Sequence, residues 1–304
     1  MNIRDLSATE LRRQLQHPGL YLRTGPFTVC IESSIASVAD GLAQLYSDFP
    51  LGQSGDFVDF HVRLVRPNTI RRWIEPQVLF LHDDHPPFKP LPLDQAYPML
   101  EWGLNWCVSS HAHQYLIIHA AVLEKNGRAV IMPAPPGSGK STLCGALANR
   151  GWRLLSDELT LIRLSDGQVV SLPRPVSLKN ASIEIMRRFE PGVVINRESR
   201  DTVKGTVAHM KPPADAVERA QETATPAWIV FPKYQTGASS QLEKRPRAQT
   251  LMQVADNAFN YTLQGRGGFD LLGRVVDACD CYDFTYSDLN DAIRIFAELA
   301  SPQS

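Results

Sequence analysis

The stretch that most constrains this chain is APPGSGKS, residues 134–141. It matches the template G-x-x-x-x-G-K-[ST] at every fixed position except the first, where Ala134 stands in place of glycine. An apolar run at 129–132 precedes the stretch, and the run TLCGALA at 142–148 follows it. These flanks predict a strand before a loop and a helix after it, which is the arrangement that cradles phosphate groups.

The motif assigns roles within this loop. Backbone N–H groups and the positive end of the following helix are expected to hold phosphate oxygens. Lys140 is expected to reach the β- and γ-phosphates, and the Ser141 hydroxyl to bind Mg²⁺. Such loops also arise by chance, and the flanking strand and helix are what favour a nucleotide, ATP with Mg²⁺. The predicted cofactor-binding residues are Pro136, Gly137, Ser138, Gly139, Lys140, Ser141 and Thr142.

Composition limits the class of protein. The 304 residues suffice for one large domain or two modest ones, and 43% hydrophobic residues support a core. The net charge of −1 includes no basic surplus, so we expect neither nucleic acid nor an anionic membrane as partner. Five scattered cysteines without a C-x-x-C pair predict reduced thiols. With no apolar signal core at the N-terminus, we expect a cytoplasmic protein.

The first 90 residues predict a small α+β module without evident chemistry. Ser7 and Glu10 form a capping-box pattern at the start of a predicted helix. The run HDDH at 82–85 contains metal-binding residue types, but it lies in a proline-rich stretch, 66–96, and a solvated loop is the favoured interpretation. The expected elements here are helices at 3–17 and 38–46 and strands at 27–31 and 57–65.

Residues 91–304 predict a second module that contains the loop. A buried strand at 115–123, the turn signal Asn126-Gly127 and a returning strand form a hairpin that runs into the loop. A second meander follows at 151–172. Two hairpins disfavour a purely parallel sheet, so we predict an α/β fold of α+β character with a mixed sheet. The other expected elements are helices at 97–110, 182–189, 248–260 and 269–276, strands at 228–232 and 282–286, a long loop at 190–225, and a last helix with Ser287 as N-cap.

Two features near the loop point to chemistry. Asp157 and Glu158 end an otherwise apolar strand and can face opposite sides of an extended chain, although two surface acids in a turn are the alternative. Phosphoryl transfer needs a metal-holding carboxylate and a group that orients or deprotonates the acceptor. His119 lies on the strand beside the loop strand, where a core histidine is the alternative.

These motifs together resemble the HPr kinase/phosphorylase family, and more closely the HPr-kinase-related proteins found beside peptide-modification or exopolysaccharide genes. The resemblance rests on HAAV at 119–122, the hairpin, GSGKS at 137–141 and LLSDE at 154–158, and covers residues 95–300. It implies a nucleotide-binding fold of the phosphoenolpyruvate-carboxykinase kind, with a mixed sheet.

The resemblance also implies residue roles. Lys140 would bind the β/γ-phosphates, His119 matches the active-site histidine, and Asp157 matches the aspartate that deprotonates the acceptor serine. Glu158 stands where the family commonly has a second Asp, which would make it a metal ligand with Ser141. The glycine-rich signature after the meander is replaced by PRPVSLK at 173–179. Candidate substrate contacts are Arg174, Lys179, Lys204, Thr206 and His209; for Arg174 and Lys179, a solvated basic stretch is the alternative.

The sequence therefore predicts an ATP-dependent kinase with Mg²⁺ that phosphorylates a hydroxyl, with a serine of a peptide or small protein as acceptor. The first alternative is a small-molecule kinase acting on free serine or a sugar. The second is a nucleotide-binding regulatory module without turnover. Whether copies of the chain form a homo-oligomer is left open.

Overall fold

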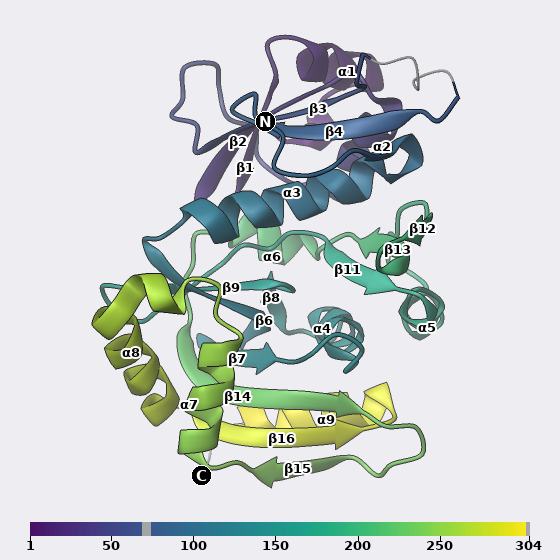
Figure 1. Ribbon diagram of the computed structural model, residues 1–304. Helices are drawn as coiled ribbons and strands as arrows, with labels where there is room; N and C mark the ends of the chain where they lie inside the picture. Colours follow the sequence, from purple (N-terminus) through teal and green to yellow (C-terminus); the bar gives the residue numbers. More distant parts are fainter. Residues whose placement is uncertain (69–73, 302–304) are drawn as a thin grey trace.

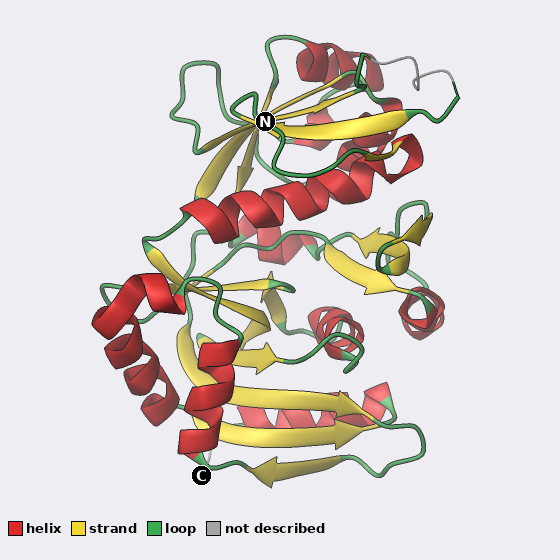
Figure 2. Cartoon of the chain, viewed as in Figure 1, coloured by secondary structure: helices red, strands yellow, loops and turns green. Residues whose placement is uncertain are grey.

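The computed structural model describes residues 1–68 and 74–301. It is an α/β fold in which the sheets combine parallel and antiparallel strands (Figures 1 and 2). Part of the predicted proline-rich loop, residues 69–73, lies outside the described residues. Within those residues, no helix has the length and apolar character needed to cross a bilayer.

The first sheet is built from the N-terminal part of the chain and has the order β1-β2-β3-β4-β5. Only β2 and β3 run parallel, and the other neighbours are antiparallel. Strands β1 and β4 were not predicted from the sequence. The five strands are β1 (Leu20–Thr24), β2 (Phe27–Ser33), β3 (Phe60–Val65), β4 (Gln77–His82) and β5 (Leu91–Pro92).

Helices α1 (Ala8–Gln16), α2 (Ala36–Leu45) and α3 (Ala96–His111) accompany this sheet. The predicted capping box at α1 is confirmed, because Ser7 Oγ accepts from the Glu10 amide and Glu10 accepts from the Ser7 amide. Helix α3 lies between the first sheet and the rest of the molecule (Figure 1). Its apolar residues share one core with β2, β3 and β4, and Leu159 and Leu161 of the second sheet join that core. The module boundary at residue 90 stays a prediction.

The second sheet is the centre of the molecule. Its order is β10-β9-β6-β7-β14-β16-β15, and β8 also pairs with β6. Strand β14 is parallel to β7 and β16, and the hairpins around β6 are antiparallel, as the sequence predicted. The strands are β6 (Tyr115–Lys125), β7 (Arg128–Pro133), β8 (Arg153–Ser156), β9 (Leu159–Arg163), β10 (Val169–Val170), β14 (Thr225–Tyr234), β15 (Gln241–Lys244) and β16 (Asp280–Tyr286).

Alternating side chains of these strands fill two cores. On β7, Val130 and Met132 pack with α4 (Lys140–Ala148) and α9 (Leu289–Ala300). Ala129 and Ile131 point to the opposite core, which includes α8 (Tyr261–Ala278) and Val254 of α7 (Arg247–Asp256). A sheet covered on both faces holds the end of β7 firmly, and the 134–141 loop begins there.

Residues 190–225 are not the long loop that the sequence predicted. They contain β12 (Ser199–Thr202), β13 (Gly205–Met210) and α6 (Ala214–Glu218). Strand β13 pairs with β12 and with β11 (Val176–Lys179), and α5 (Ala181–Phe189) follows β11. The polarity of this segment concealed its strands because β12 is an edge strand with two exposed residues.

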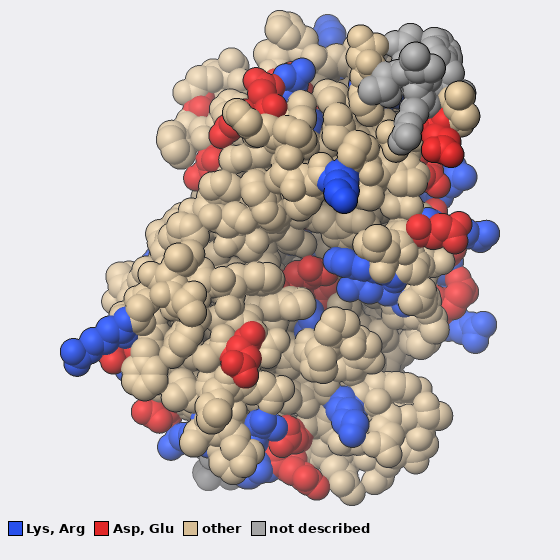
Figure 3. Space-filling view, viewed as in Figure 1, with Lys and Arg blue, Asp and Glu red and all other residues tan. Residues whose placement is uncertain are grey.

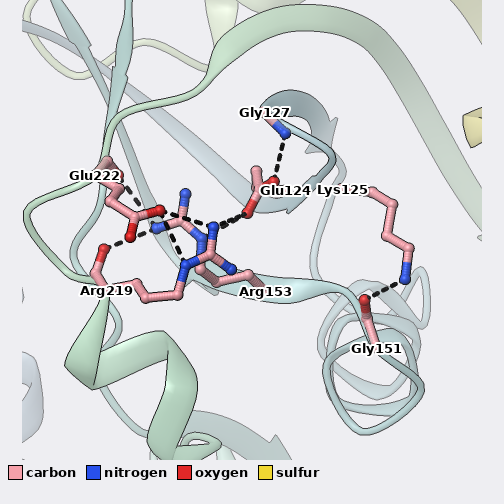
Figure 4. Close-up of polar contacts among 7 residues, drawn as sticks. All are labelled: Glu124, Lys125, Gly127, Gly151, Arg153, Arg219 and Glu222. Atoms are coloured by element: carbon pink, nitrogen blue, oxygen red, sulfur yellow. Dashed lines mark hydrogen bonds and ion pairs between the residues drawn. The ribbon is translucent and has the colours of Figure 1, made fainter.

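A buried ion pair fastens the β6–β7 hairpin to β8. Glu124 Oε2 accepts from Arg153 Nε at 2.5 Å, and Glu124 Oε1 accepts from the Gly127 amide in the hairpin turn (Figure 4). Arg153 Nη1 also donates to the carbonyl oxygens of Arg219 and Glu222. With both charges paired and hydrogen-bonded, this cluster fixes the start of β8, whose far end leads to Asp157 and Glu158.

The last helix does not begin as predicted. Asp288 is the N-cap of α9, since its Oδ1 accepts from the amides of Asn290 and Asp291 at 2.8 and 3.0 Å. The hydroxyl of Ser287 instead donates to the Ala238 carbonyl. Both residue types cap helices well, so their order in the sequence could not decide between them.

Candidate functional site

The 134–141 loop connects the end of β7 to the start of α4. Gly137 and Gly139 have φ of 85° and 86°, a region that side chains rarely adopt. A Cβ on Gly139 would lie 2.4 Å from the Tyr286 hydroxyl, which donates to the Gly139 carbonyl. Ala134 has no positive φ and is buried, so the loop does not need glycine at its first position.

The backbone of the loop leaves several donors free. The amides of Gly139, Lys140, Ser141 and Thr142 donate to no backbone or side-chain acceptor within the described parts of the chain. The amide of Leu143 is the next along and bonds to the Gly139 carbonyl. Successive free N–H groups at a helix N-terminus, reached through a glycine loop, form a suitable cradle for an anion.

A cavity of about 600 Å³ opens over this cradle. Figure 3 shows acidic and basic side chains side by side in the hollow between α3 and the second sheet. The cavity walls combine the loop and the start of α9 with polar groups from β6, from the turn after β8, from β11 and the residue after it, and from α5. Those groups are His119, Glu158, Ser177, Lys179, Asn180, Ser182 and Arg188.

Lys140 and Asp157 form a buried pair beneath the loop. The Lys140 ammonium donates to the Asp157 backbone carbonyl and lies 3.7 Å from carboxylate Oδ1. Asp157 Oδ2 accepts from the Ser177 amide at 3.1 Å, whereas Oδ1 has no hydrogen-bond partner in the described structure. The Asp157 side chain therefore lines the small cavity described below and does not line the large one.

Glu158 and His119 line the large cavity beside the loop, together with the cations Lys140, Lys179 and Arg188. Burial raises the pKa of Glu158, but the charges of Lys140, Lys204, Lys179 and His119 outweigh it and leave that pKa below its ordinary value. Burial, and then the charge of Lys140, lowers the pKa of His119. At neutral pH Glu158 is therefore a carboxylate and His119 a neutral imidazole, which can accept a proton.

Arg174 and His209 do not line the large cavity, and their role as substrate contacts stays a prediction. Arg174 is buried against Glu101, with Nη2 donating to Glu101 Oε2 at 2.5 Å. His209 is 1% exposed, and neither ring nitrogen has a partner within the described residues. Both residues line a second cavity of only about 20 Å³, together with Asp157, Ser177 and Trp102.

Of the other predicted substrate contacts, one lines the large cavity and two do not. Lys179, at the end of β11, lines the large cavity. Lys204, in the turn between β12 and β13, does not, but its ammonium lies 5.0 Å from the Trp102 ring centre and its charge acts on Glu158. Thr206 lines neither cavity, and its amide donates to the Asn180 side chain.

The candidate metal ligands lie together in the large cavity. Ser141 and Glu158 both line it and offer oxygen donors, the kind that Mg²⁺ prefers. Across the described residues, no three His, Cys, Asp or Glu side chains converge on a metal-sized point. The side chains of the 82–85 run do not gather around one point. The centre of the His82 ring lies 4.7 Å from that of the His111 ring, whereas the next three residues are exposed.

The polar residues that hold Glu158 were not among those predicted from the sequence. Asn105 Nδ2 donates to Glu158 Oε2 at 3.3 Å, and Asn105 Oδ1 accepts from Arg174. Glu101 accepts from Arg174 and from the Tyr46 and Tyr97 hydroxyls. A signal was present, because Glu101 and Asn105 are polar residues four apart within the apolar stretch of the helix.

Comparisons with known proteins overlap this region. The model of the family described as SynChlorMet cassette protein ScmC matches residues 98–184, which hold the loop, Asn105, Asp157, Glu158 and Arg174. No curated protein matches the chain. Among solved structures, the HPr(Ser) kinase/phosphatase from Coxiella burnetii is similar at 12% identity and a TM-score of 0.27, over 60% of this chain and 96% of that one.

Proposed function

We propose that this chain is a Mg²⁺-dependent kinase that transfers the γ-phosphoryl group of ATP to a hydroxyl, and that the acceptor is a serine of a peptide or small protein. The observation that carries the proposal is the glycine loop with four free amides, set beside a buried lysine and facing a carboxylate and a neutral imidazole across one cavity. Phosphoryl transfer relies on such positioning and charge stabilisation.

Each group has a proposed role. The free amides of 139–142 hold the β- and γ-phosphates, and Lys140 leaves the Asp157 carbonyl to join them. Ser141 and Glu158 would hold Mg²⁺, which when bound offsets the charge of the phosphates. Lys179 lies on the same wall and adds positive charge towards the acceptor side.

Two groups could take the proton of the acceptor hydroxyl. Asp157, the predicted base, has a buried Oδ1 that lies 3.7 Å from the Lys140 ammonium and has no hydrogen-bond partner in the described structure. His119 already faces the cavity and is neutral at pH 7. Removing the true base abolishes transfer and leaves ATP binding intact, so Asp157→Asn and His119→Gln identify it.

The test is an acceptor screen with ATP and Mg²⁺, read by mass spectrometry for added phosphate. Phosphate on peptides supports the proposal, and phosphate on free serine or a sugar supports the small-molecule alternative. ATP binding without transfer to either pool would favour a regulatory nucleotide-binding module. Lys140→Ala is the control, because it removes the phosphate-binding charge.

A further inference from the structure

Glu158 is connected to the N-terminal part of the chain by a continuous series of hydrogen bonds. Asn105 Nδ2 donates to Glu158 Oε2 at 3.3 Å, and Arg174 Nη1 donates to Asn105 Oδ1 at 2.8 Å. Arg174 Nη2 donates to the backbone carbonyl of Glu101 at 2.8 Å and to its carboxylate at 2.5 Å. The series ends at Glu101, whose carboxylate is buried.

Arg174 determines which way the Asn105 amide faces. A guanidinium group only donates hydrogen bonds, so the amide oxygen of Asn105 must be the atom that faces it. The NH₂ group is then directed at Glu158. The reversed amide would set NH₂ against the guanidinium and oxygen against the carboxylate, and both contacts would be repulsive. Arg174 therefore determines that the Asn105 NH₂ group is the donor to Glu158, although Arg174 itself donates no hydrogen bond to Glu158 within the described structure.

Arg174 is itself immobilised. It is 6% exposed, and its Nε donates to the Tyr46 hydroxyl at 3.3 Å. The Tyr46 and Tyr97 hydroxyls donate to Glu101 at 2.9 and 2.7 Å, so Glu101 is fully engaged. These residues come from the end of α2, from α3 and from the segment before β11. A network of buried groups with satisfied partners is rigid.

We propose that Asn105, oriented by Arg174, is a positioning residue for Glu158 in the large cavity. It occupies Oε2, whereas Oε1 accepts no hydrogen bond from the described part of the chain and stays available on the cavity side. The inference rests on the proposed function, in which Glu158 helps to hold Mg²⁺ with the nucleotide. It adds that the carboxylate is held in place before Mg²⁺ and nucleotide arrive.

The proposal predicts different effects on two quantities: the affinity for ADP without Mg²⁺, and the increase in that affinity when Mg²⁺ is added. The loop amides and Lys140 bind phosphate without Glu158, so losing Asn105 leaves Mg²⁺-free ADP binding unchanged. The gain in affinity that Mg²⁺ adds passes through Glu158, so it shrinks. Because a hydrogen bond to a charged group contributes substantially to binding free energy, we expect the increase in ADP affinity caused by Mg²⁺ to become about tenfold smaller.

The experiment is isothermal titration of ADP, with and without Mg²⁺, into wild type, Asn105→Leu, Glu158→Gln and the double variant. Ser109→Ala is the matched control, because it lies one turn along the same helix and donates only to the Trp106 carbonyl. We expect Asn105→Leu to reduce the Mg²⁺ gain in the wild-type background and to have no further effect beside Glu158→Gln. Melting temperatures verify that each variant is folded.

Two results overturn the inference. One is a Mg²⁺ gain in Asn105→Leu equal to that of wild type, and the other is an equal reduction by Asn105→Leu in both backgrounds. If Asn105→Leu does not fold, Arg174→Lys replaces it, since lysine keeps the charge beside Glu101 but cannot present the fork that also holds Asn105. Failure of wild type to bind ADP at all contradicts the nucleotide site itself and is seen in the first titration.

Discussion

The Lys140 ammonium donates to the backbone carbonyl of Asp157 and lies 3.7 Å from carboxylate Oδ1 of the same residue. Both side chains are almost fully buried, so the pair is shielded from water. Lys140 also lines the large cavity over the loop, so we expect bound phosphates to draw its ammonium away from Asp157. Phosphate binding and exposure of the Asp157 carboxylate are thus expected to be linked movements.

Asp157→Asn tests this link. Asparagine keeps the shape and can still accept from the Ser177 amide, but it cannot take a proton. If Asp157 is the base, transfer should fall by at least about a hundredfold, while the ADP dissociation constant stays close to that of wild type. Rates come from a phosphorylation assay and affinities from calorimetry. Transfer at the wild-type rate in Asp157→Asn, together with its loss in His119→Gln, would assign the base to His119.

Arg174→Met should destabilise the fold. It leaves the buried carboxylate of Glu101 without its ion pair, which costs about 3–5 kcal/mol of unfolding free energy. Arg200→Met is the control: its side chain is 78% exposed and lies 3.9 Å from Glu198, so a change within about 0.5 kcal/mol is expected. Urea unfolding measures both. Equal effects of the two substitutions would show that the Arg174 network does not stabilise the fold.

Stability should fall as pH drops below the ordinary histidine value of 6.5. Burial lowers the pKa of His209 in the folded protein, so below pH 6.5 the unfolded chain binds more protons than the folded one. The unfolding free energy therefore decreases with falling pH in the window between these two pKa values.

His209→Phe should reduce this acid sensitivity. Phenylalanine can keep the edge-on packing against Tyr97, and both imidazole nitrogens lack partners among the described residues. At pH 8 we expect His209→Phe to equal wild type or exceed it by about 1 kcal/mol. Denaturant titrations at several pH values measure the slope. A slope unchanged by the substitution would place the acid sensitivity on other groups.

Gly139→Ala should damage the loop. It puts a Cβ 2.4 Å from the Tyr286 hydroxyl at a φ of 86°, and we expect a cost of about 1–3 kcal/mol together with weaker ADP binding. Gly273→Ala is the matched control in α8. A Cβ added there would meet no atom within 4 Å outside the backbone of its own helix, and the φ of Gly273 is not positive. That change should stabilise by about 0.5–1 kcal/mol. Unimpaired ADP binding by Gly139→Ala would contradict the assigned role of the loop backbone.

Elements marked by long apolar runs and clear boundary signals were predictable from sequence. The strands of the β6–β7 hairpin and helices α3 and α4 fall within a few residues of their predicted bounds, because their apolar runs are nearly continuous and the Asn126-Gly127 turn and the glycine loop delimit them. Short polar edge strands were not. β15 has the sequence QLEK and β12 the sequence SRDT, and neither buries enough side chains to show a pattern.

For the site, local motifs located residues but could not orient them. The loop and the Asp157-Glu158 pair were evident from spacing, whereas the side that each carboxylate faces depends on β11 and α3, which are distant in sequence. Arg174 carried the same charge as Lys179 in one basic stretch. Burial against Glu101 distinguishes the two, and that contact joins residues 73 positions apart.

The most direct test of the whole account is calorimetric titration of ADP with Mg²⁺ into wild type and Lys140→Ala. We predict saturable binding of one ADP per chain to the wild type and a large loss of affinity in the variant, since the loop lysine carries the phosphate-binding charge. Absence of binding to the wild type, or equal binding to both proteins, would contradict a nucleotide site at residues 134–141.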